Sequence, residues 1–221
     1  TSMTPMPHLT CVAHRRDEID DIVAGYRDEG LDNILALGGD PPADGSQPPG
    51  DFRYAVELID AVRGIGDFCV GVAAHPELHP RSGGDRAADR RRLADKLRLA
   101  DFAITQFFFD PADYFSMVEE VARLGVTKPI IPGVIPVTNA GQVERFAALS
   151  GASFPPALAA RLHAVADRPD EVRKIGVEVA TELTAALLAG GAPGIHFYTL
   201  NFARATLEIY RNLGMGPGAR A

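Results

Sequence analysis

The sequence predicts an α/β fold, specifically a (β/α)8 TIM barrel of which six strand–helix units are represented in the 221 residues. Short apolar runs recur along the chain, and turn-forming or polar residues follow them. Amphipathic stretches separate the runs, so strands and helices are expected to alternate. The runs are almost continuously apolar, which is typical of parallel strands covered on both faces. Strand–helix units of this kind form parallel sheets through right-handed crossovers.

The predicted strands are residues 8–13, 33–39, 68–74, 102–109, 129–136 and 194–200. The predicted helices are residues 17–29, 52–62, 85–96, 114–124 and 178–188. In the first helix, Ile19, Ile22 and Val23 share one face, and Gly30 ends the helix as a C-terminal cap. The interval 137–189 is longer than the others and predicts three helices.

A closed barrel contains eight strands, whereas six are predicted here. We therefore expect a single TIM-barrel domain over residues 1–221, with the first two strand–helix units of the barrel lying outside this chain. An open, doubly wound sheet is the alternative architecture. No Gly-x-Gly-x-x-Gly turn follows a predicted strand, and this favours the barrel.

The composition excludes several functional classes. Acidic residues outnumber basic ones by 29 to 22, giving a net charge of −7, so we expect neither a nucleic-acid nor a membrane partner. No apolar stretch reaches the roughly 20 residues that span a bilayer, and the first residues lack a signal-peptide pattern. Cys11 and Cys69 lie in apolar runs, which suits buried thiols in a reducing compartment. We therefore expect a cytoplasmic protein.

Polar residues at the carboxyl ends of the predicted strands are the candidates for chemistry, since barrel enzymes build their sites there. Asp40 follows Gly38 and Gly39, which let the backbone approach a ligand closely. Its carboxylate accepts hydrogen bonds from a heterocycle, although a capped turn is the plainer interpretation. His75 and His79 are four residues apart, but prolines near them disfavour a helical metal pair, and we expect no metal.

Later segments contain three further candidates. Gln106 stands in an apolar strand, where its amide pairs either with a heterocycle edge or with other protein groups. The helix over 85–96 concentrates basic residues, which indicates either a phosphate site or a solvated face. Gln142 and Phe146 are four residues apart on a predicted helix and therefore share a face. Core packing is the default interpretation of Phe146.

Six motifs together resemble one family. They are PHLTC at 7–11, LALGGDP at 35–41, VAAHPELHP at 72–80, ITQFFFD at 104–110, IPGVIPV at 131–137 and HFYTLN at 196–201. In order and spacing they resemble the methylenetetrahydrofolate reductases, over about residues 8–214. The resemblance implies a TIM barrel with FAD at the carboxyl ends of its strands. NADH or NADPH would reduce the flavin and leave, and methylenetetrahydrofolate would then take the hydride to give methyltetrahydrofolate.

The resemblance also assigns roles to residues of this chain. It implies FAD contacts at His8, Gly39, Asp40, Tyr54, Ala55, His75, His79, Asp89 and Lys96. It implies folate contacts at Asp40, Gln106, Gln142, Phe146 and Leu200. Asp40 would act in catalysis by hydrogen-bonding the substrate and making the flavin harder to reduce, and Gln106 by meeting both pterin and nicotinamide. The family's general acid, a Glu on the first barrel strand, would precede Thr1, and a homo-oligomer is expected.

The chain departs from the family pattern at three positions. Gly38 replaces an Arg that contacts the flavin, His75 replaces an aromatic residue, often Tyr, and Phe202 replaces an Arg expected near the folate. These departures leave two alternatives to the flavin-dependent reductase: a reductase without tightly held flavin, and a barrel that binds folate or flavin without catalysis. An unrelated barrel lyase or aldolase ranks last, because no predicted strand contains a lysine.

Overall fold

The computed structural model describes residues 3–39 and 50–215. Six strands form one sheet in the order β1-β2-β3-β4-β5-β6. β1 pairs with β2, β2 with β3 and β5 with β6, in each case in parallel. Doubly wound sheets reverse their strand order at a switch point, whereas this sheet follows chain order without reversal. The α/β, TIM-barrel-like fold class is therefore confirmed.

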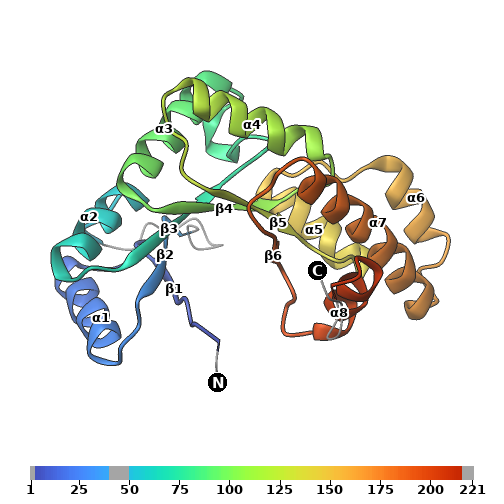
Figure 1. Cartoon of the computed structure of the whole chain (residues 1–221), viewed down its shortest axis with the longest axis horizontal. Coiled ribbons are helices and arrows are strands. Elements are labelled where there is room, and N and C mark those ends of the chain that lie inside the picture. The colour runs from blue at the N-terminus through green and yellow to red at the C-terminus, as the bar shows by residue number, and fades with distance from the viewer. Residues whose placement is uncertain (1–2, 40–49, 216–221) are drawn as a thin grey trace. The chain divides into compact units, whose positions relative to one another are not determined.

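The strands are β1 (His8–Thr10), β2 (Asn33–Leu37), β3 (Cys69–Ala74), β4 (Phe102–Phe107), β5 (Ile130–Val134) and β6 (His196–Phe197) (Figure 1). The α-helices are α1 (Arg16–Asp28), α2 (Ala55–Ile65), α3 (Arg86–Leu99), α4 (Pro111–Arg123), α5 (Ala140–Ser150), α6 (Pro156–His163), α7 (Pro169–Ala189) and α8 (Ala203–Asn212). A 3-10 helix, η1, covers Pro80–Ser82. Each predicted strand is confirmed, but most end two or three residues early because the chain turns into a loop there.

The helix predicted over 52–62 begins later than expected. Tyr54 is extended and precedes the first helical residue, Ala55. The side chain of Glu57 fixes this start, because its Oε2 accepts hydrogen bonds from the backbone N–H groups of Arg53 at 2.6 Å and Tyr54 at 3.3 Å. Such capping satisfies donors that a helix leaves unpaired at its first turn.

The prediction of three helices in the interval 137–189 is confirmed by α5, α6 and α7. The helix predicted over 178–188 is the carboxyl half of α7, which begins at Pro169. Proline fits the first turn of a helix because the N–H that it lacks would be unpaired there. Helix α8, which buries Ala205 and Ile209, was not predicted.

Residue contacts divide the chain into two compact units. The first contains Thr1–Ala73, Arg91–Ala103 and Leu124–Pro129. Its fully buried apolar side chains come mainly from α1, α2, β2 and β3: Ile19, Val23, Ile34, Ala36, Leu58, Ile59, Val62, Val70 and Val72. Within this unit, α1 packs against α2 and α2 against β2 (Figure 1). Burying each large aliphatic side chain contributes about 1.5–3 kcal/mol, so the two helices fix strands β1–β3.

The second unit contains Ala74–Arg90, Ile104–Arg123 and Ile130–Ala221. One of its apolar clusters joins the end of β4, the loop after β5 and helices α5–α7: Phe107, Ile135, Val137, Ala140, Val143, Ala147, Leu158, Leu162 and Val172. Gly176 lets α7 approach this cluster closely, because a Cβ there would lie 1.9 Å from the carbonyl oxygen of Val137. In the described part of the chain, no helix is both long enough and apolar enough to cross a membrane.

Candidate functional site

Strained backbone lies after the carboxyl ends of three strands. Four described residues other than glycine have a positive φ: Ala13 (65°), Leu78 (88°), Leu200 (49°) and Asn201 (64°). The first follows β1, the second follows β3 and the last two follow β6. Such conformations cost about 1–3 kcal/mol each and cluster at functional sites, where the surroundings hold them in place. The strain therefore marks the strand ends at which barrel enzymes build their sites.

Gly39 follows β2 with a φ of 81°, which favours glycine. A Cβ at this position would lie 2.4 Å from Cγ1 of Val12 and 3.1 Å from Cβ of Thr10. A side chain would thus force the loop to shift, which explains glycine here, while the FAD contact of Gly39 stays a prediction. Asp40 lies outside the described residues, so its catalytic role also stays a prediction.

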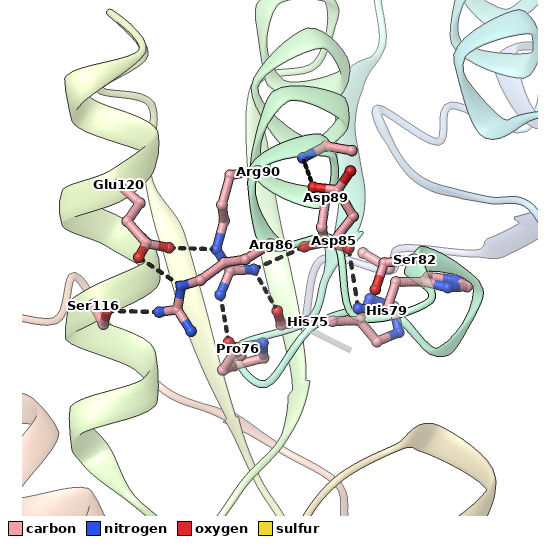
Figure 2. Close-up of polar contacts among 12 residues, drawn as sticks. His75, Pro76, His79, Ser82, Asp85, Arg86, Asp89, Arg90, Ser116 and Glu120 are labelled. Carbon is pink, nitrogen blue, oxygen red and sulfur yellow. Dashed lines mark hydrogen bonds and ion pairs between the residues drawn. The ribbon is translucent and has the colours of Figure 1, made fainter.

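The histidine loop, residues 75–79, connects β3 to η1 and brings three predicted FAD contacts together. The ring centroids of His75 and His79 are 4.5 Å apart, with an interplanar angle of 59°. The backbone N–H of His79 donates to Oδ1 of Asp89 at 3.0 Å (Figure 2). The backbone N–H of Arg81 donates to Nδ1 of His79 at 3.0 Å, so the neutral imidazole of His79 carries its proton on Nε2.

Arg90 of α3 holds the histidine loop by its backbone carbonyls. The Arg90 side chain is 3% exposed. Its Nη1 donates to the carbonyl of His75 at 3.0 Å, and its Nη2 donates to the carbonyl of Pro76 at 2.6 Å (Figure 2). Nη1 also donates to Oδ2 of Asp89 at 2.8 Å. A planar guanidinium can hold several acceptors at fixed angles, so Arg90 orders the loop that presents both histidines.

Glu120 of α4 completes this polar network. Its Oε2 accepts from Nε of Arg90 at 2.8 Å, and its Oε1 accepts from Nε of Arg86 at 2.7 Å. Arg86 also donates to Oγ of Ser116 at 2.8 Å (Figure 2). Burial alone would raise the pKa of Glu120, but the hydrogen bonds and charges of Arg86 and Arg90 outweigh burial and lower it. Glu120 thus engages two arginines of the basic segment 85–96, while a phosphate site on this segment stays a prediction.

Lys96 belongs to the same basic segment on α3, and its side chain reaches the carboxyl end of β3. Its Nζ donates to the carbonyl of Ala73 at 2.7 Å. Of the other predicted FAD contacts in the first unit, Tyr54 is 64% exposed and Ala55 begins α2. His8 lies at the amino end of β1, whereas most other predicted contacts follow the carboxyl ends of strands. The FAD contacts of these residues stay predictions.

Gln106 lies near the carboxyl end of β4, partly buried. Its Oε1 accepts a hydrogen bond from the backbone N–H of Phe107 at 3.1 Å. Among the described residues, its Nε2 has no hydrogen-bond partner. The amide is thus oriented by the protein through its oxygen and has donor capacity left for a heterocycle. The folate contact of Gln106 stays a prediction.

Gln142 and Phe146 lie on α5, four residues apart and therefore on one face. The backbone N–H of Gln142 donates to Oδ1 of Asn139, which caps the helix at 3.0 Å. Phe146 packs against the apolar cluster of the second unit, in agreement with the core-packing interpretation. Leu200 is 45% exposed, and Phe202, which replaces the expected arginine, is 74% exposed. Folate contacts at Gln142, Phe146 and Leu200 stay predictions.

Tyr198, which sequence reasoning did not select, bonds to the residue before Gln106. Its hydroxyl donates to the carbonyl of Thr105 at 2.8 Å, and burial raises the pKa of Tyr198 to about 12. The hydroxyl therefore keeps its proton and remains a donor at neutral pH. The only sequence signal was its place in the motif HFYTLN, within the strand predicted over 194–200, and nothing in the motif reveals the partner. Among the described residues, no group of three or more His, Cys, Asp or Glu side chains could hold a metal ion.

Comparison with known proteins places these residues in a family. The family model described as "Methylenetetrahydrofolate reductase" matches residues 1–214. The 5,10-methylenetetrahydrofolate reductase of Salmonella typhimurium is 35% identical over 220 residues, which cover 99% of this chain and 73% of the relative. That of Escherichia coli is 34% identical over 219 residues, with the same coverage of both chains. A probable NADH-type methylenetetrahydrofolate reductase from Oryza sativa is 34% identical, with 95% of this chain and 38% of the relative covered.

Among solved structures, an uncharacterized protein from Clostridium thermocellum superposes with a TM-score of 0.62. The match covers 93% of this chain and 71% of that chain at 15% sequence identity, and it supports the fold assignment alone. The family model and the bacterial relatives cover nearly the whole chain, and the relatives are more than 30% identical to it. The chain therefore belongs to the methylenetetrahydrofolate reductase family.

Proposed function

We propose that the protein reduces methylenetetrahydrofolate to methyltetrahydrofolate, with NADH or NADPH as hydride source and FAD as the carrier. The observation that carries this proposal is the family match over residues 1–214. Curated relatives bear the name of this reaction, and plant relatives bear the name of its NADH form. The Clostridium thermocellum protein, which is described as binding 5-methyl-5,6,7,8-tetrahydrofolic acid, is in keeping with a folate ligand for this fold.

Each unit offers residues whose chemistry, taken within that unit, suits a part of FAD. Lys96 brings a positive charge to the carboxyl end of β3, where it suits a diphosphate. Tyr54 offers an exposed aromatic ring at the start of α2. His75 and His79 are held on a loop that Arg90 and Asp89 order. When bound, FAD supplies reversible hydride transfer, which no protein side chain provides.

The folate would be held by Gln106, near the carboxyl end of β4, and by residues of α5, which follows β5. Gln106 presents its Nε2 to an acceptor on the pterin, while its Oε1 stays anchored to the backbone of Phe107. Gln142, in the first turn of α5, provides a second amide, and Phe146 on the same helix face provides an aromatic surface. Anchored amides lower the entropy lost when the substrate is oriented, so the pterin meets the hydride donor in a fixed geometry.

This reaction is tested with the full-length protein purified in the presence of FAD. NADH or NADPH and methylenetetrahydrofolate are supplied, and methyltetrahydrofolate is quantified by chromatography. We expect one methyltetrahydrofolate for each nucleotide oxidised. If the protein binds folate tightly but forms no methyltetrahydrofolate with either nucleotide, the proposal is wrong and a folate-binding barrel without catalysis replaces it.

Gly38→Arg is expected to tighten FAD binding by about tenfold, the effect of one charge-assisted hydrogen bond. Gly38 is the position at which the family commonly has Arg. Nothing lies within 4 Å of a Cβ built there, and its φ is not in the left-handed region, so the side chain can be accommodated. FAD affinity is measured from the quenching of flavin fluorescence during titration of the apoprotein.

Gly25→Arg is the matched control for the added charge. Gly25 is exposed on α1, and a Cβ there also meets nothing within 4 Å. If both variants gain the same FAD affinity, the gain is a general charge effect, and the contact of residue 38 with the flavin is refuted. If wild-type protein turns over folate with no bound flavin, the flavin-free alternative holds.

A further inference from the structure

Thr105 lies in β4 immediately before Gln106, and its polar atoms bond to residues outside β4. The Thr105 side chain and backbone are fully buried. Its Oγ1 accepts the backbone N–H of Gly133 at 2.8 Å. Its carbonyl accepts the hydroxyl of Tyr198 at 2.8 Å. Thr105 is therefore fixed through side-chain hydrogen bonds to β5 and to the residue that follows β6.

Tyr198 reaches Thr105 by passing over Gly133. The backbone of Tyr198 follows β6 and donates its N–H to the carbonyl of Val134 at 2.9 Å. A Cβ at Gly133 would lie 2.6 Å from Cε2 of Tyr198 and 2.3 Å from the carbonyl oxygen of Thr105. Only glycine leaves room for the phenol ring to lie there. Glycine at position 133 is thus needed for the hydrogen bond between Tyr198 and Thr105.

The Tyr198 hydrogen bond acts directly on the backbone of Gln106. The carbonyl of Thr105 belongs to the peptide unit whose nitrogen and next Cα are those of Gln106. Because a peptide unit is planar, a bond that fixes its oxygen also fixes the orientation of the following Cα. The next peptide is fixed by Gln106 itself, whose Oε1 accepts the N–H of Phe107 at 3.1 Å. The Gln106 side chain therefore extends from backbone that is held on both sides.

We propose that Tyr198 is a positioning residue for Gln106, and that its hydroxyl orients the Gln106 amide toward the pterin of the folate substrate. This inference rests on the proposed function only in that Gln106 binds folate. Tyr198 does not itself need to touch the substrate. Its ring also packs near Phe107 and His196, with centroids 6.2 and 4.8 Å away, so the hydroxyl must be tested separately from the ring.

Tyr198→Phe removes the hydroxyl and keeps the ring. We expect kcat/KM for methylenetetrahydrofolate to fall about tenfold or more, because small misplacements of an orienting group are costly. The affinity for methyltetrahydrofolate, measured by calorimetry, should fall in parallel. Both measurements use the full-length protein with FAD bound.

Tyr114→Phe is a matched control within the same unit. The hydroxyl of Tyr114 donates to the carbonyl of Ile130 at 2.8 Å, and burial raises the pKa of Tyr114 to about 12, as for Tyr198. Ile130 is the first residue of β5, so this bond lies at the amino end of the strand. Both variants lose one phenol–carbonyl bond and should lose similar thermal stability. Only Tyr198→Phe should alter folate kinetics and affinity.

A double-mutant cycle tests whether Tyr198 acts through Gln106. In a Gln106→Ala background, Tyr198→Phe should change folate affinity and kcat/KM by less than twofold. Additive losses in the two variants, or equal kinetic losses for Tyr114→Phe and Tyr198→Phe, would overturn the positioning role. Folate affinity is measured as well as turnover. If the wild-type protein lacks reductase activity, the proposed function is refuted, but the affinities of the variants still measure the coupling between Tyr198 and Gln106. If the wild-type protein binds no folate, both proposals fail.

Discussion

Replacing Arg90 with methionine is expected to destabilise the protein by about 3–5 kcal/mol, the cost of removing one partner from a buried ion-pair network. The change keeps much of the apolar stem and removes the guanidinium. It removes the cation paired with the Asp89 carboxylate, and it removes the Arg90 donors from the carbonyls of His75 and Pro76, of which the first keeps the backbone N–H of Leu78. The free energy of unfolding is measured by urea denaturation of the full-length protein.

Arg86→Met is the control for the shared carboxylate. Arg86 also pairs with Glu120, but its side chain is 48% exposed, and its hydrogen bonds to Glu120 and Ser116 both go to α4. An exposed pair of this kind contributes about 0–1 kcal/mol. Equal destabilisation by the two variants would show that the loop contacts of Arg90 contribute little. The predicted role of Arg90 in ordering the loop would then be wrong.

The network also predicts an acid dependence. The pKa of Glu120 is lowered in the folded protein, so its ion pairs stabilise the fold above the ordinary carboxyl value of 4.5 and lose that contribution as the pH falls below it. Arg90→Met removes one of the two cations that lower this pKa. The stability difference between wild type and Arg90→Met should therefore narrow as the pH falls through that range, a trend that the same denaturation experiment measures.

Gln106→Ala is expected to slow folate reduction by about 5- to 150-fold, which corresponds to the 1–3 kcal/mol of a lost hydrogen bond to a buried heterocycle. The resemblance implies that the same amide meets both pterin and nicotinamide. We therefore expect both half-reactions, flavin reduction by NAD(P)H and flavin oxidation by methylenetetrahydrofolate, to slow. Each is followed separately by stopped-flow absorbance under anaerobic conditions.

Gln106→Glu tests the loss of the Nε2 donor separately from the loss of side-chain size. It keeps the length and the oxygen that accepts the Phe107 N–H, and it replaces the Nε2 donor with an acceptor. If the donor binds the pterin, the glutamate variant should be as slow with folate as the alanine variant. A glutamate variant with wild-type rates, or an alanine variant with an unchanged NAD(P)H half-reaction, would contradict the role assigned to the amide.

Local patterns in the sequence were sufficient to predict the strands and most of the helices. The run at 33–39, for example, becomes β2, with Ile34 and Ala36 fully buried as continuous apolarity predicts. The carboxyl ends of strands were predicted less well. Leu200 and Asn201, which follow β6, adopt left-handed conformations, and a sequence pattern does not reveal φ at residues other than glycine.

The candidate site was predicted in part, because residue type indicates chemistry but not partners. Gln106 was selected because an amide in an apolar strand needs hydrogen-bond partners, and the structure supplies one of them. Arg90 could not be distinguished from its exposed neighbours Arg91 and Arg92, since its burial depends on Glu120, 30 residues away. Tyr198 was missed because its partner is 93 residues distant. Such pairings depend on tertiary structure and have no local signature.

The most direct test of hydride transfer through FAD is an anaerobic flavin absorbance measurement on the full-length protein with FAD bound. We expect NADH or NADPH to bleach the flavin band and methylenetetrahydrofolate then to restore it, with one methyltetrahydrofolate formed for each flavin reoxidised. A flavin that NAD(P)H reduces but that methylenetetrahydrofolate leaves reduced would contradict the account.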